Sequence, residues 1–394
     1  MLKHKRILIG ISGGIAAYKV PFLVRLLVKA GAEVRVMMTP KAHEFVSAEV
    51  LAVFTNHPVI SEFYTQNGMW NNHVHWAEWA ELIVIVPATL NTMGALAQGS
   101  CTRFLDAVYF SSKCPVILCP AMDLEMYQSQ ALQLHVQQLK TRSNLIVIEP
   151  ESGLLASGLE GQGRLPEPDI IFKHIKDYIA QQLPLYTKKV LISAGPTHEY
   201  IDPVRFIGNA SSGRMGIALA EAFSALGAHV QLVLGPTTLT TSYTSIDICR
   251  VISAEDMLVA MQQRFKDQDL VIAAAAVADY RPKIKHHHKL KKNTDLSLEL
   301  IANPDILKTL SALKSQQCLV GFALETQHLQ EHALQKLKSK GLDYIIANWA
   351  SEAIGTTRSR AWIINKHNNT TEISFAKKDE LARQIAQFFI TVLK

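Results

Sequence analysis

The chain has 394 residues and a formal net charge of +6, with 48% hydrophobic and 19% charged residues. This length allows two or three globular domains, and a modest charge without a basic stripe favours small anionic substrates and argues against nucleic acid. No apolar run approaches the roughly eighteen residues of a membrane span, and the cysteines form no CxxC pair, so we expect a cytoplasmic protein without membrane segments or a disulfide framework.

Apolar runs alternate with helical stretches in the first half of the chain. The predicted strands are Ile7–Ile11, Glu33–Met38, Leu82–Val86, Val116–Cys119 and Leu145–Ile148. The predicted helices are Tyr18–Ala30, Thr92–Gln98, Leu124–Leu139 and Ile170–Gln182. This alternation is typical of a parallel, doubly wound sheet. The segment Leu183–Lys188 then separates the halves, which predicts domains at residues 1–185 and 186–394.

The second half restarts the same alternation. Its predicted strands are Val190–Ser193, Val230–Leu234, Val271–Ala275, Leu319–Phe322 and Tyr344–Ala347. Its predicted helices are Arg214–Leu226, Ala254–Phe265, Asp305–Leu313, Glu331–Lys340 and Lys378–Val392, with a late hairpin over Ala361–Phe375. Ser253 and Asp305 suit helix starts. We therefore predict two doubly wound, Rossmann-like α/β domains, the second with a mainly parallel sheet.

Two polar loops follow predicted strands of the first half. Ser12, Gly13 and Gly14 come directly after the first strand, and Pro87–Thr92 comes after the third. Glycines let backbone N–H groups approach a phosphate, although no third glycine completes the GxGxxG dinucleotide fingerprint. The first loop is therefore either a phosphate-binding loop or a tight turn, and the second is either a ligand loop or a capping segment.

These loops are part of a wider resemblance. The segments that carry it are Ser12–Lys19, Met38–Thr39, His73 ahead of Trp79–Ala80, Pro87–Thr92, Pro120–Met122 with Met126–Tyr127, and Gly161–Arg164. They make residues 5–180 similar to the flavin-dependent cysteine decarboxylases, and among these to the phosphopantothenoylcysteine decarboxylases. The resemblance implies a flavodoxin-like fold in which FMN is held by Ser12, Gly13, Gly14, Thr39, Pro87, Ala88, Thr89 and Asn91.

The resemblance also implies a reaction and a catalytic histidine. The flavin would oxidise the substrate thiol to a thioaldehyde, carbon dioxide would leave, and the reduced flavin and a proton donor would restore the thiol from the resulting enethiol. His73 matches the catalytic histidine of the family, where a neutral imidazole can accept the thiol proton or orient the carboxylate. Taken alone, a histidine in this polar stretch is typical of a surface residue, and His75 is a local alternative.

Two positions depart from the family pattern. Asp123 stands where the Pro-Ala-Met motif of the family continues with asparagine, and Ser157 stands where many relatives have the cysteine that protonates the enethiol. An ionised Asp123 would repel the substrate carboxylate, so we expect it either to be protonated or to bind another group. A serine hydroxyl is a much weaker acid than a thiol, and Cys119 is typical of a buried core residue. FMN binding is therefore better supported than complete decarboxylation.

The second half has its own polar segments. They are Gly195–Glu199, Asp202–Arg205, Asn209–Gly216, the small-residue run Ala273–Arg281, and the basic segment Lys289–Lys292 beside His286–His288. Hydroxyls and glycines just before a helix suit a phosphate, to which Arg205 and Arg214 add charge. The alternatives are an N-capped helix for these groups and a solvated loop for the lysines and histidines.

These segments make residues 188–394 similar to the phosphopantothenate–cysteine ligases. The resemblance implies that phosphopantothenate attacks CTP to give an acyl-cytidylate, from which the amine of cysteine displaces CMP, with Mg²⁺ neutralising the polyphosphate. It assigns Asn209 to the acyl group, and CTP to Ala273, Ala274, Ala275, Asp279, Lys289, Asn303, Pro304, Asp305, Ile306, Phe322, Lys336 and Lys340. We assign the substrate phosphate to Arg205, Ser211, Ser212, Gly213 and Arg214. The choice of CTP over ATP rests on the resemblance, and no metal ligands are assigned.

The order of the halves is that of the bifunctional bacterial enzymes of coenzyme A synthesis. The second half would make phosphopantothenoylcysteine, and the first would decarboxylate it to phosphopantetheine. Three alternatives stay open: an active ligase with a flavin-binding but catalytically weak assembly domain, a decarboxylase of terminal cysteines in peptides, and a pure binding protein. The family also implies a homo-oligomer larger than a dimer.

Overall fold

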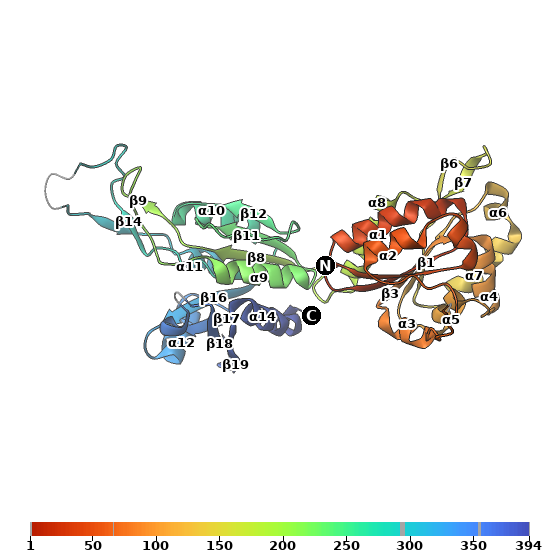
Figure 1. The fold of residues 1–394 in the computed structure, drawn as a ribbon. Coiled ribbons are helices and arrows are strands. Elements are labelled where there is room, and N and C mark those ends of the chain that lie inside the picture. The colour runs from red at the N-terminus through yellow and green to blue at the C-terminus, as the bar shows by residue number, and fades with distance from the viewer. Residues whose placement is uncertain (1, 66, 292–295, 354–355, 394) are drawn as a thin grey trace. The chain divides into compact units, whose positions relative to one another are not determined.

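The computed structural model describes residues 2–65, 67–291, 296–353 and 356–393. The chain divides into two compact units, Leu2–Ile179 and Ala180–Lys394, and each has its own sheet (Figure 1). Of the basic segment predicted to bind polyphosphate, Lys292 lies outside the described residues.

The first unit contains a five-stranded parallel sheet in the order β2-β1-β3-β4-β5, which confirms the predicted doubly wound topology. Its strands are β1 (Arg6–Ile11), β2 (Glu33–Met38), β3 (Leu82–Ala88), β4 (Val116–Pro120) and β5 (Leu145–Val147), followed by the hairpin β6 (Glu151–Leu154) and β7 (Glu160–Arg164). Its helices are η1 (Ile15–Lys19), α1 (Val20–Lys29), η2 (Pro40–Glu44), α2 (Ala48–Thr55), α3 (His73–Trp79), α4 (Leu90–Gln98), α5 (Phe104–Ser111), α6 (Leu124–Gln128), α7 (Gln130–Lys140) and α8 (Pro168–Gln181).

Both faces of this sheet are buried, which is why its strands are continuous apolar runs. Ile7 and Ile9 of β1 pack into the core formed with α1 and α8, whereas Leu8 packs into the core formed with α3, α4, α5 and α7. Because helices cover the two faces, we expect ligands to bind at the carboxyl ends of the strands.

Two helices of the first unit differ from the prediction. The segment predicted as a single helix over Leu124–Leu139 forms α6 and α7, because Ser129 is extended and its hydroxyl accepts a hydrogen bond from the Leu132 N–H (3.3 Å) as the N-cap of α7. The helix predicted from Tyr18 begins earlier, as the 3₁₀ turn η1, before α1. The sequence prediction also missed α2, α3, α5 and the β6–β7 hairpin.

The second unit contains an eight-stranded sheet in the order β12-β11-β8-β13-β16-β17-β18-β19. Its strands are β8 (Lys189–Ala194), β11 (His229–Leu234), β12 (Asp247–Arg250), β13 (Leu270–Ala273), β16 (Cys318–Glu325), β17 (Tyr344–Trp349), β18 (Arg358–Asn365) and β19 (Thr370–Lys377). The sheet is parallel from β12 to β17, and β18 and β19 form the predicted antiparallel hairpin. Strand β13 ends at Ala273, two residues before the predicted end. Beyond it the chain runs beside the segment after β8, where Pro196 and Ala276 form an isolated parallel bridge.

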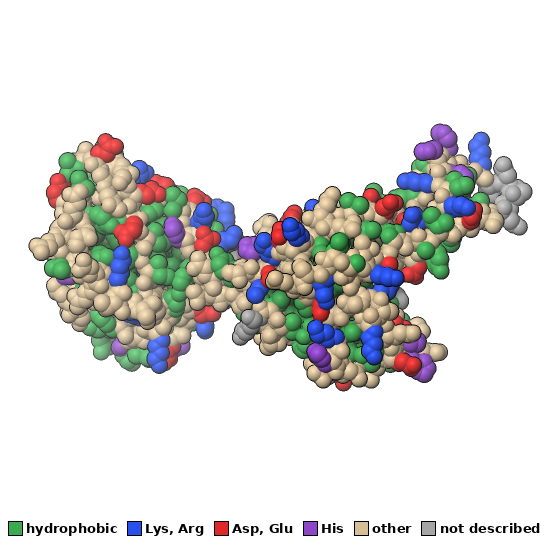
Figure 2. All heavy atoms as spheres, turned by 180° about the vertical axis from the view of Figure 1, so that it is seen from behind, with side chains coloured by type: hydrophobic (Ala, Val, Ile, Leu, Met, Phe, Trp, Pro, Cys, Tyr) green, Lys and Arg blue, Asp and Glu red, His purple; other side chains and the backbone are tan. Residues whose placement is uncertain are grey.

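Helices cover both faces of this second sheet (Figure 1). They are α9 (Arg214–Ala225) and α14 (Lys378–Leu393) on one face, and α10 (Ala254–Phe265), α11 (Ile306–Leu313) and α12 (Leu329–Ser339) on the other, with the short α13 (Ala350–Ala353) after β17. The pairs β9 (Glu199–Tyr200) with β10 (Phe206–Ile207) and β14 (Tyr280–Pro282) with β15 (Leu300–Ala302) form an arm beyond the sheet. Figure 2 shows lysine and histidine side chains gathered toward the end of this arm.

Within the described part of the chain, no helix is both long enough and apolar enough to span a bilayer. All five cysteines are unpaired thiols.

Candidate functional sites

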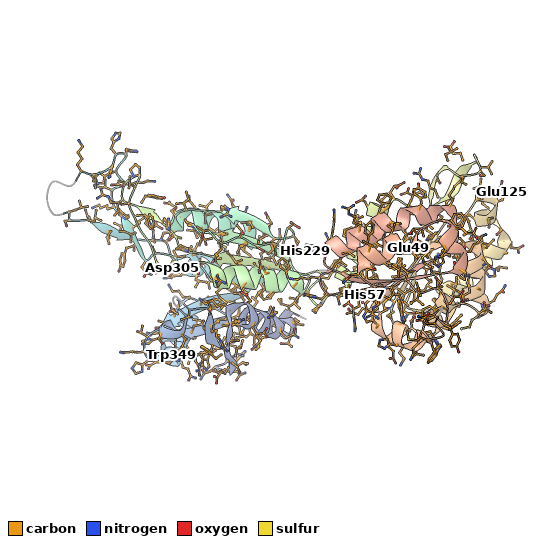
Figure 3. All side chains as sticks on the ribbon, in the orientation of Figure 1. Glu49, His57, Glu125, His229, Asp305 and Trp349 are labelled. Carbon is orange, nitrogen blue, oxygen red and sulfur yellow. The ribbon has the colours of Figure 1, made fainter. Side chains whose placement is uncertain are left out.

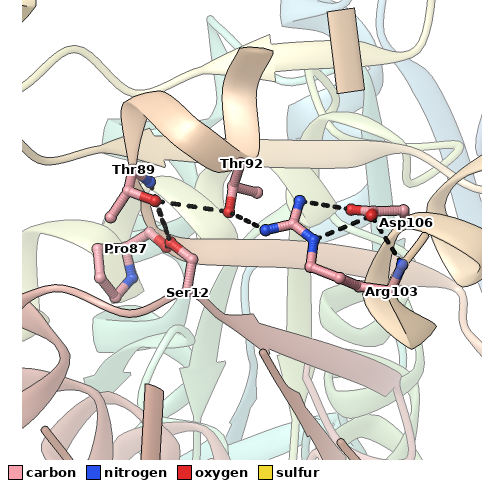
Figure 4. Close-up of polar contacts among 6 residues, drawn as sticks. All are labelled: Ser12, Pro87, Thr89, Thr92, Arg103 and Asp106. Atoms are coloured by element: carbon pink, nitrogen blue, oxygen red, sulfur yellow. Dashed lines mark hydrogen bonds and ion pairs between the residues drawn. The ribbon is translucent and has the colours of Figure 1, made fainter. Parts of the chain in front are cut away.

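Three hydroxyl groups converge where β1 and β3 end (Figure 4). The Ser12 hydroxyl donates to the Pro87 carbonyl (2.7 Å) and accepts from the Thr89 N–H (3.0 Å). The Thr89 hydroxyl lies 3.2 Å from Ser12 Oγ and 3.5 Å from Thr92 Oγ1. Because β1 lies between β2 and β3, this is the point where the strand order reverses, and open α/β sheets bind ligands at such points.

Arg103 is hydrogen-bonded to this cluster and links it to Asp106. Arg103 donates from Nη1 to Thr92 Oγ1 (3.2 Å), and from Nε and Nη2 to the two carboxylate oxygens of Asp106 (2.9 and 2.7 Å). Thr92 and Asp106 are fully buried. Sequence reasoning missed this pair, because nothing in an Arg-x-x-Asp spacing indicates that the arginine contacts the first turn of α4, eleven residues earlier.

The Ser12–Gly14 loop packs closely enough to require a glycine at position 13 and leaves little room for a side chain at position 14. A Cβ on Gly13 would lie 2.7 Å from Lys41 Cβ, and a Cβ on Gly14 would lie 3.1 Å from Thr89 Cγ2. The other predicted cofactor residues border the same sheet edge: Thr39 is buried after β2, Pro87 and Ala88 end β3, and Asn91 is exposed on α4. Hydroxyl and backbone donors without a carboxylate among these loop residues fit a phosphate-bearing cofactor.

His73 is the first residue of α3, and its ring is held by aromatic side chains. The ring centroids of Phe63 and Trp70 lie 5.9 and 6.1 Å from that of His73, both edge to face. Phe63 also contacts Phe104, which follows Arg103 at the start of α5. The buried Nδ1 of His73 has no hydrogen-bond partner among the described residues, whereas His75 is exposed. The structure therefore distinguishes His73 from its neighbour as a positioned imidazole with an unused polar atom.

Asp123 and Ser157, the two departures from the family pattern, are hydrogen-bonded to each other. The Ser157 hydroxyl donates to Asp123 Oδ1 (2.9 Å), which also accepts from the Leu124 N–H (2.8 Å) as the N-cap of α6. Ser157 lies on the turn of the β6–β7 hairpin, and the Met122 N–H donates to the Gly163 carbonyl (3.1 Å) of the same hairpin. The structure thus joins two positions that are distant in the sequence.

Two further groups of the first unit, the Cys119 thiol and the Tyr127 hydroxyl, have raised pKa values and are therefore weaker acids than usual. Cys119 is fully buried in β4, and burial raises the pKa of its thiol, so it is a core residue and a poor proton donor. Burial and the neighbouring Glu149 carboxylate raise the pKa of Tyr127, whose hydroxyl lies 2.5 Å from Glu149 Oε2.

In the second unit, the predicted ligase residues gather where β8 and β13 end. The Ala276 N–H donates to the Gly195 carbonyl (2.9 Å), and Asn209 Nδ2 donates to the Val277 carbonyl (2.9 Å). The predicted base-binding residues Ala273, Ala274 and Ala275 are partly exposed, and Asp279 is exposed. Small side chains leave this backbone open to a planar ligand.

A second group of predicted residues surrounds the start of α11. Asp305, labelled in Figure 3, caps this helix by accepting from the Lys308 N–H (3.1 Å). It also forms an ion pair with Lys340, the residue that follows α12. Partial burial opposes ionisation of Asp305, but the hydrogen bonds from Lys340 and Lys308 hold its pKa below the usual value. Asn303 donates from Nδ2 to the Ala278 carbonyl (2.8 Å), which links the residues around the start of α11 to the segment that follows β13. Pro304 is partly exposed beside them, and Ile306 is buried.

Lys336 lies between these groups and β16. Its ammonium group donates to the Phe322 carbonyl (2.8 Å), and burial lowers the pKa of Lys336. The Lys336 ammonium group also interacts electrostatically with the carboxylates of Glu325, Asp279 and Asp305.

Among the residues predicted to bind the substrate phosphate, Arg205 is engaged in an ion pair with Asp202. Its Nε donates to the buried Asp202 carboxylate (3.0 Å), and its Nη2 donates to the Leu290 carbonyl (2.9 Å). The hydrogen bonds from Arg205 hold the pKa of Asp202 well below its usual range. This ion pair ties the β9–β10 turn to the loop that carries the exposed Lys289.

The remaining phosphate residues precede α9. Gly213 is its N-cap with a left-handed φ of 76°, and a Cβ there would lie 3.2 Å from Gly195 Cα. Ser211 is partly exposed, and Ser212 and Arg214 are exposed. Among the described residues, no three or more His, Cys, Asp or Glu side chains are grouped to hold a metal ion, including those around His286–His288.

Two family models match the chain. A flavoprotein family matches residues 1–180, and the C-terminal domain of the DNA/pantothenate metabolism flavoproteins matches residues 185–392. The coenzyme A biosynthesis bifunctional protein CoaBC of Bacillus subtilis is 40% identical over 394 residues, covering 98% of this chain and 97% of that protein. The chain belongs to this family. It is a flavoprotein and a bifunctional enzyme of coenzyme A biosynthesis, with a decarboxylase half and a ligase half.

Two other comparisons complete this picture. A cysteine/cysteine sulfinic acid decarboxylase from an unknown prokaryotic organism is 41% identical over 353 residues, covering 87% of this chain and 98% of that protein. A crystal structure of the C-terminal domain of a coenzyme A biosynthesis bifunctional protein CoaBC is 41% identical, covers 54% of this chain and 98% of its own, and has a TM-score of 0.47.

Proposed function

We propose that residues 186–394 join cysteine to 4′-phosphopantothenate in a CTP-dependent reaction, and that residues 1–185 decarboxylate the resulting phosphopantothenoylcysteine to 4′-phosphopantetheine. The observation that carries this proposal is the 40% identity to a bifunctional relative across both halves of the chain. The geometry supports it, since Ser12, Thr39 and Thr89 lie at the carboxyl edge of the first sheet, and Ala273–Ala275 lie at that of the second.

In the first half, FMN would be held by the Ser12–Gly14 loop, Thr39 and the loop after β3. When bound, it would supply the two-electron oxidation of the substrate thiol that makes loss of carbon dioxide feasible. The Thr89 hydroxyl would contact it, and Ser12 would hold Thr89 in place by accepting the hydrogen bond from its N–H (3.0 Å). His73, whose Nδ1 has no partner among the described residues, would take up the thiol proton.

In the second half, the cytosine would lie against the Ala273–Ala275 backbone beside Asp279, and the triphosphate would face Lys289, Lys336 and Lys340. Asn209 would orient the acyl group, and the Ser211–Arg214 segment would bind the substrate phosphate. Mg²⁺ would be held mainly by the phosphates, as is usual for this ion in nucleotide sites.

We also propose a homo-oligomer larger than a dimer. Large apolar side chains are exposed on η1, α1 and α2 of the first unit: Ile15 at 61%, Phe22 at 62% and Val53 at 79%. Large apolar side chains exposed on neighbouring elements are a feature of interaction sites. Light scattering should give a mass above twice that of the 43.7-kDa chain. A monomer or dimer would contradict this assignment.

The central test uses the purified full chain, reconstituted with FMN and supplied with 4′-phosphopantothenate, cysteine, CTP and Mg²⁺. We expect pyrophosphate release, followed by release of carbon dioxide and formation of 4′-phosphopantetheine. Omitting CTP should abolish all three, and replacing it with ATP should give far less pyrophosphate. Pyrophosphate release that does not depend on phosphopantothenate would overturn the ligase assignment.

A second candidate function is decarboxylation of free cysteine or cysteine sulfinic acid, the activity in the name of the relative that is 41% identical. Supplying these two amino acids in place of phosphopantothenoylcysteine distinguishes the candidates. We expect carbon dioxide only from phosphopantothenoylcysteine. Pyrophosphate release without carbon dioxide from any of the three would instead support an active ligase with a catalytically weak flavin domain.

A further inference from the structure

The ion pair of Arg103 and Asp106 lies next to the hydroxyl cluster, which is formed by Ser12, Thr89 and Thr92 (Figure 4). The function proposed above gives this pair no role. Asp106 is fully buried, and the side chain of Arg103 is 18% exposed. Both carboxylate oxygens of Asp106 are satisfied by Arg103, and one also accepts the Arg103 N–H (3.1 Å) at the start of α5. This pairing fixes the guanidinium plane and aims Nη1 at Thr92.

The hydrogen bonds of the cluster have a definite direction, because a guanidinium can only donate. Arg103 therefore makes Thr92 Oγ1 an acceptor at 3.2 Å. The single hydroxyl proton of Ser12 is engaged by the Pro87 carbonyl at 2.7 Å. Thr89 Oγ1 also lies 3.2 Å from Ser12 Oγ, which donates toward it. For its own proton, the Thr89 hydroxyl is left with a contact of 3.5 Å to Thr92, a length at which such a bond is weak.

Thr89 is consequently the member of the cluster that can donate to a ligand. It is partly exposed at the sheet edge, whereas Ser12 and Thr92 are buried. We propose that Arg103 is a positioning residue of the flavin site, which acts through Thr92 to hold the Thr89 hydroxyl as a donor toward an electron-rich oxygen or nitrogen of the cofactor. This inference rests on the proposed FMN site.

The test measures FMN affinity, not turnover. Apoprotein of the full chain is titrated with FMN, and the quenching of flavin fluorescence gives the Kd. Replacing Arg103 alone would leave a buried, unpaired carboxylate, so the variant is Arg103→Met with Asp106→Asn, which removes both charges and keeps an acceptor for the Arg103 N–H. The second variant is Thr92→Val, which keeps the shape and removes the hydroxyl.

We expect the Arg103→Met/Asp106→Asn variant and the Thr92→Val variant each to raise the Kd for FMN about tenfold. The variant that combines them should be no weaker than Thr92→Val, because both changes interrupt the same chain of contacts. Arg103→Lys, which keeps a cationic donor, should recover part of the affinity and is available if the uncharged pair does not fold.

Arg142→Met is the matched control. Arg142 is also partly buried and donates to the carbonyls of Ser112 (2.8 Å) and Tyr109 (3.2 Å), without contact to the hydroxyl cluster. Its Kd should stay within twofold of the original. Additive losses, or an unchanged Kd in the Arg103 variants, would overturn the inference alone. A failure of the unmodified chain to bind FMN would overturn the proposed flavin site and the inference with it.

Discussion

Asp123 and Ser157 share a hydrogen bond of 2.9 Å, so the two side chains that depart from the decarboxylase pattern act as one unit. The Oδ1 atom of Asp123 accepts hydrogen bonds from Ser157 and from the Leu124 N–H, whereas an asparagine at this position would have an amide nitrogen that donates. The pair holds the β6–β7 turn against the start of α6. Its structural role is clear, and its effect on the chemistry is testable.

Ser157→Cys should raise the rate of 4′-phosphopantetheine formation at least about tenfold. The physical reason is acidity, since a thiol has a pKa of about 8.5 and a serine hydroxyl is a far weaker acid. Product formation by the full chain from phosphopantothenoylcysteine checks this. Ser157→Ala is the control, because it also removes the bond to Asp123 but adds no acid. Equal rates for the two variants would show that position 157 does not supply the proton.

Local packing explains the loop after β1 at the scale of elements. Gly13 lies against η2, and a Cβ at this position would approach Lys41 Cβ and Cγ to 2.7 Å. The loop can follow its course beside η2 only without that atom.

Gly13→Ala should lower stability by about 1–3 kcal/mol through overpacking, and should weaken FMN binding more than tenfold because the loop must move. Thermal unfolding and FMN titration measure the two effects. Gly153→Ala is a suitable control in the same unit, since the nearest atom to its Cβ would be 3.6 Å away. Retained FMN affinity in Gly13→Ala would contradict a cofactor contact by this loop.

A buried lysine connects η1 to the segment after β7. The side chain of Lys19 is 8% exposed, and its ammonium group donates to Glu167 (2.8 Å) and to the Leu165 carbonyl (3.0 Å). The hydrogen bond from Lys19 lowers the pKa of Glu167, with further help from Arg164. These contacts hold the segment after the β6–β7 hairpin against η1, the element that follows the proposed cofactor loop Ser12–Gly14.

Glu167→Gln should lower the stability of the first unit by about 1 kcal/mol at pH 7, a value discounted because Glu167 is half-exposed. The folded-state pKa lies below the unfolded-state value near 4.5, so the stabilisation is present above that pH. It is lost as the pH falls through the lowered pKa, and the two proteins should then converge. Hydrogen exchange of peptides from residues 2–179 at increasing urea measures the difference. Glu44→Gln, at an exposed pair with Lys41, should have almost no effect at any pH.

Over the whole molecule, two separate units carry consecutive steps, and each has its own sheet edge and its own predicted residues. If the proposed division is correct, damage to one site leaves the chemistry of the other intact.

His73→Asn should slow carbon dioxide release at least about 100-fold, the scale of a lost general base, and leave pyrophosphate release within twofold. Lys336→Met should slow pyrophosphate release, because the cation that we propose faces the triphosphate is lost. It should leave carbon dioxide release within twofold when phosphopantothenoylcysteine is supplied directly. Separate assays of pyrophosphate and carbon dioxide on the full chain measure both. Parallel losses in both assays would contradict the division of functions.

The features predicted correctly are those that depend on neighbouring residues. Ser253 and Asp305 cap their helices as expected, because an N-cap needs only a side-chain oxygen and an N–H three residues later. The features that were missed depend on distant parts of the chain. The contact of Arg103 with Thr92 and that of Ser157 with Asp123 leave no periodic or spacing signal.

The sequence by itself determined the two α/β domains, the glycine loops after their first strands and the residues available for chemistry, because apolar periodicity and backbone requirements are local. The tertiary structure decided which polar groups meet. Among the residues that the structure describes, it left Nδ1 of His73 without a partner. It also joined Asp123 to Ser157, paired Arg205 with Asp202, and placed Arg103 in contact with Thr92 of the hydroxyl cluster. Hydrogen bonds and ion pairs require contact at about 3 Å, and only the folded chain sets those distances.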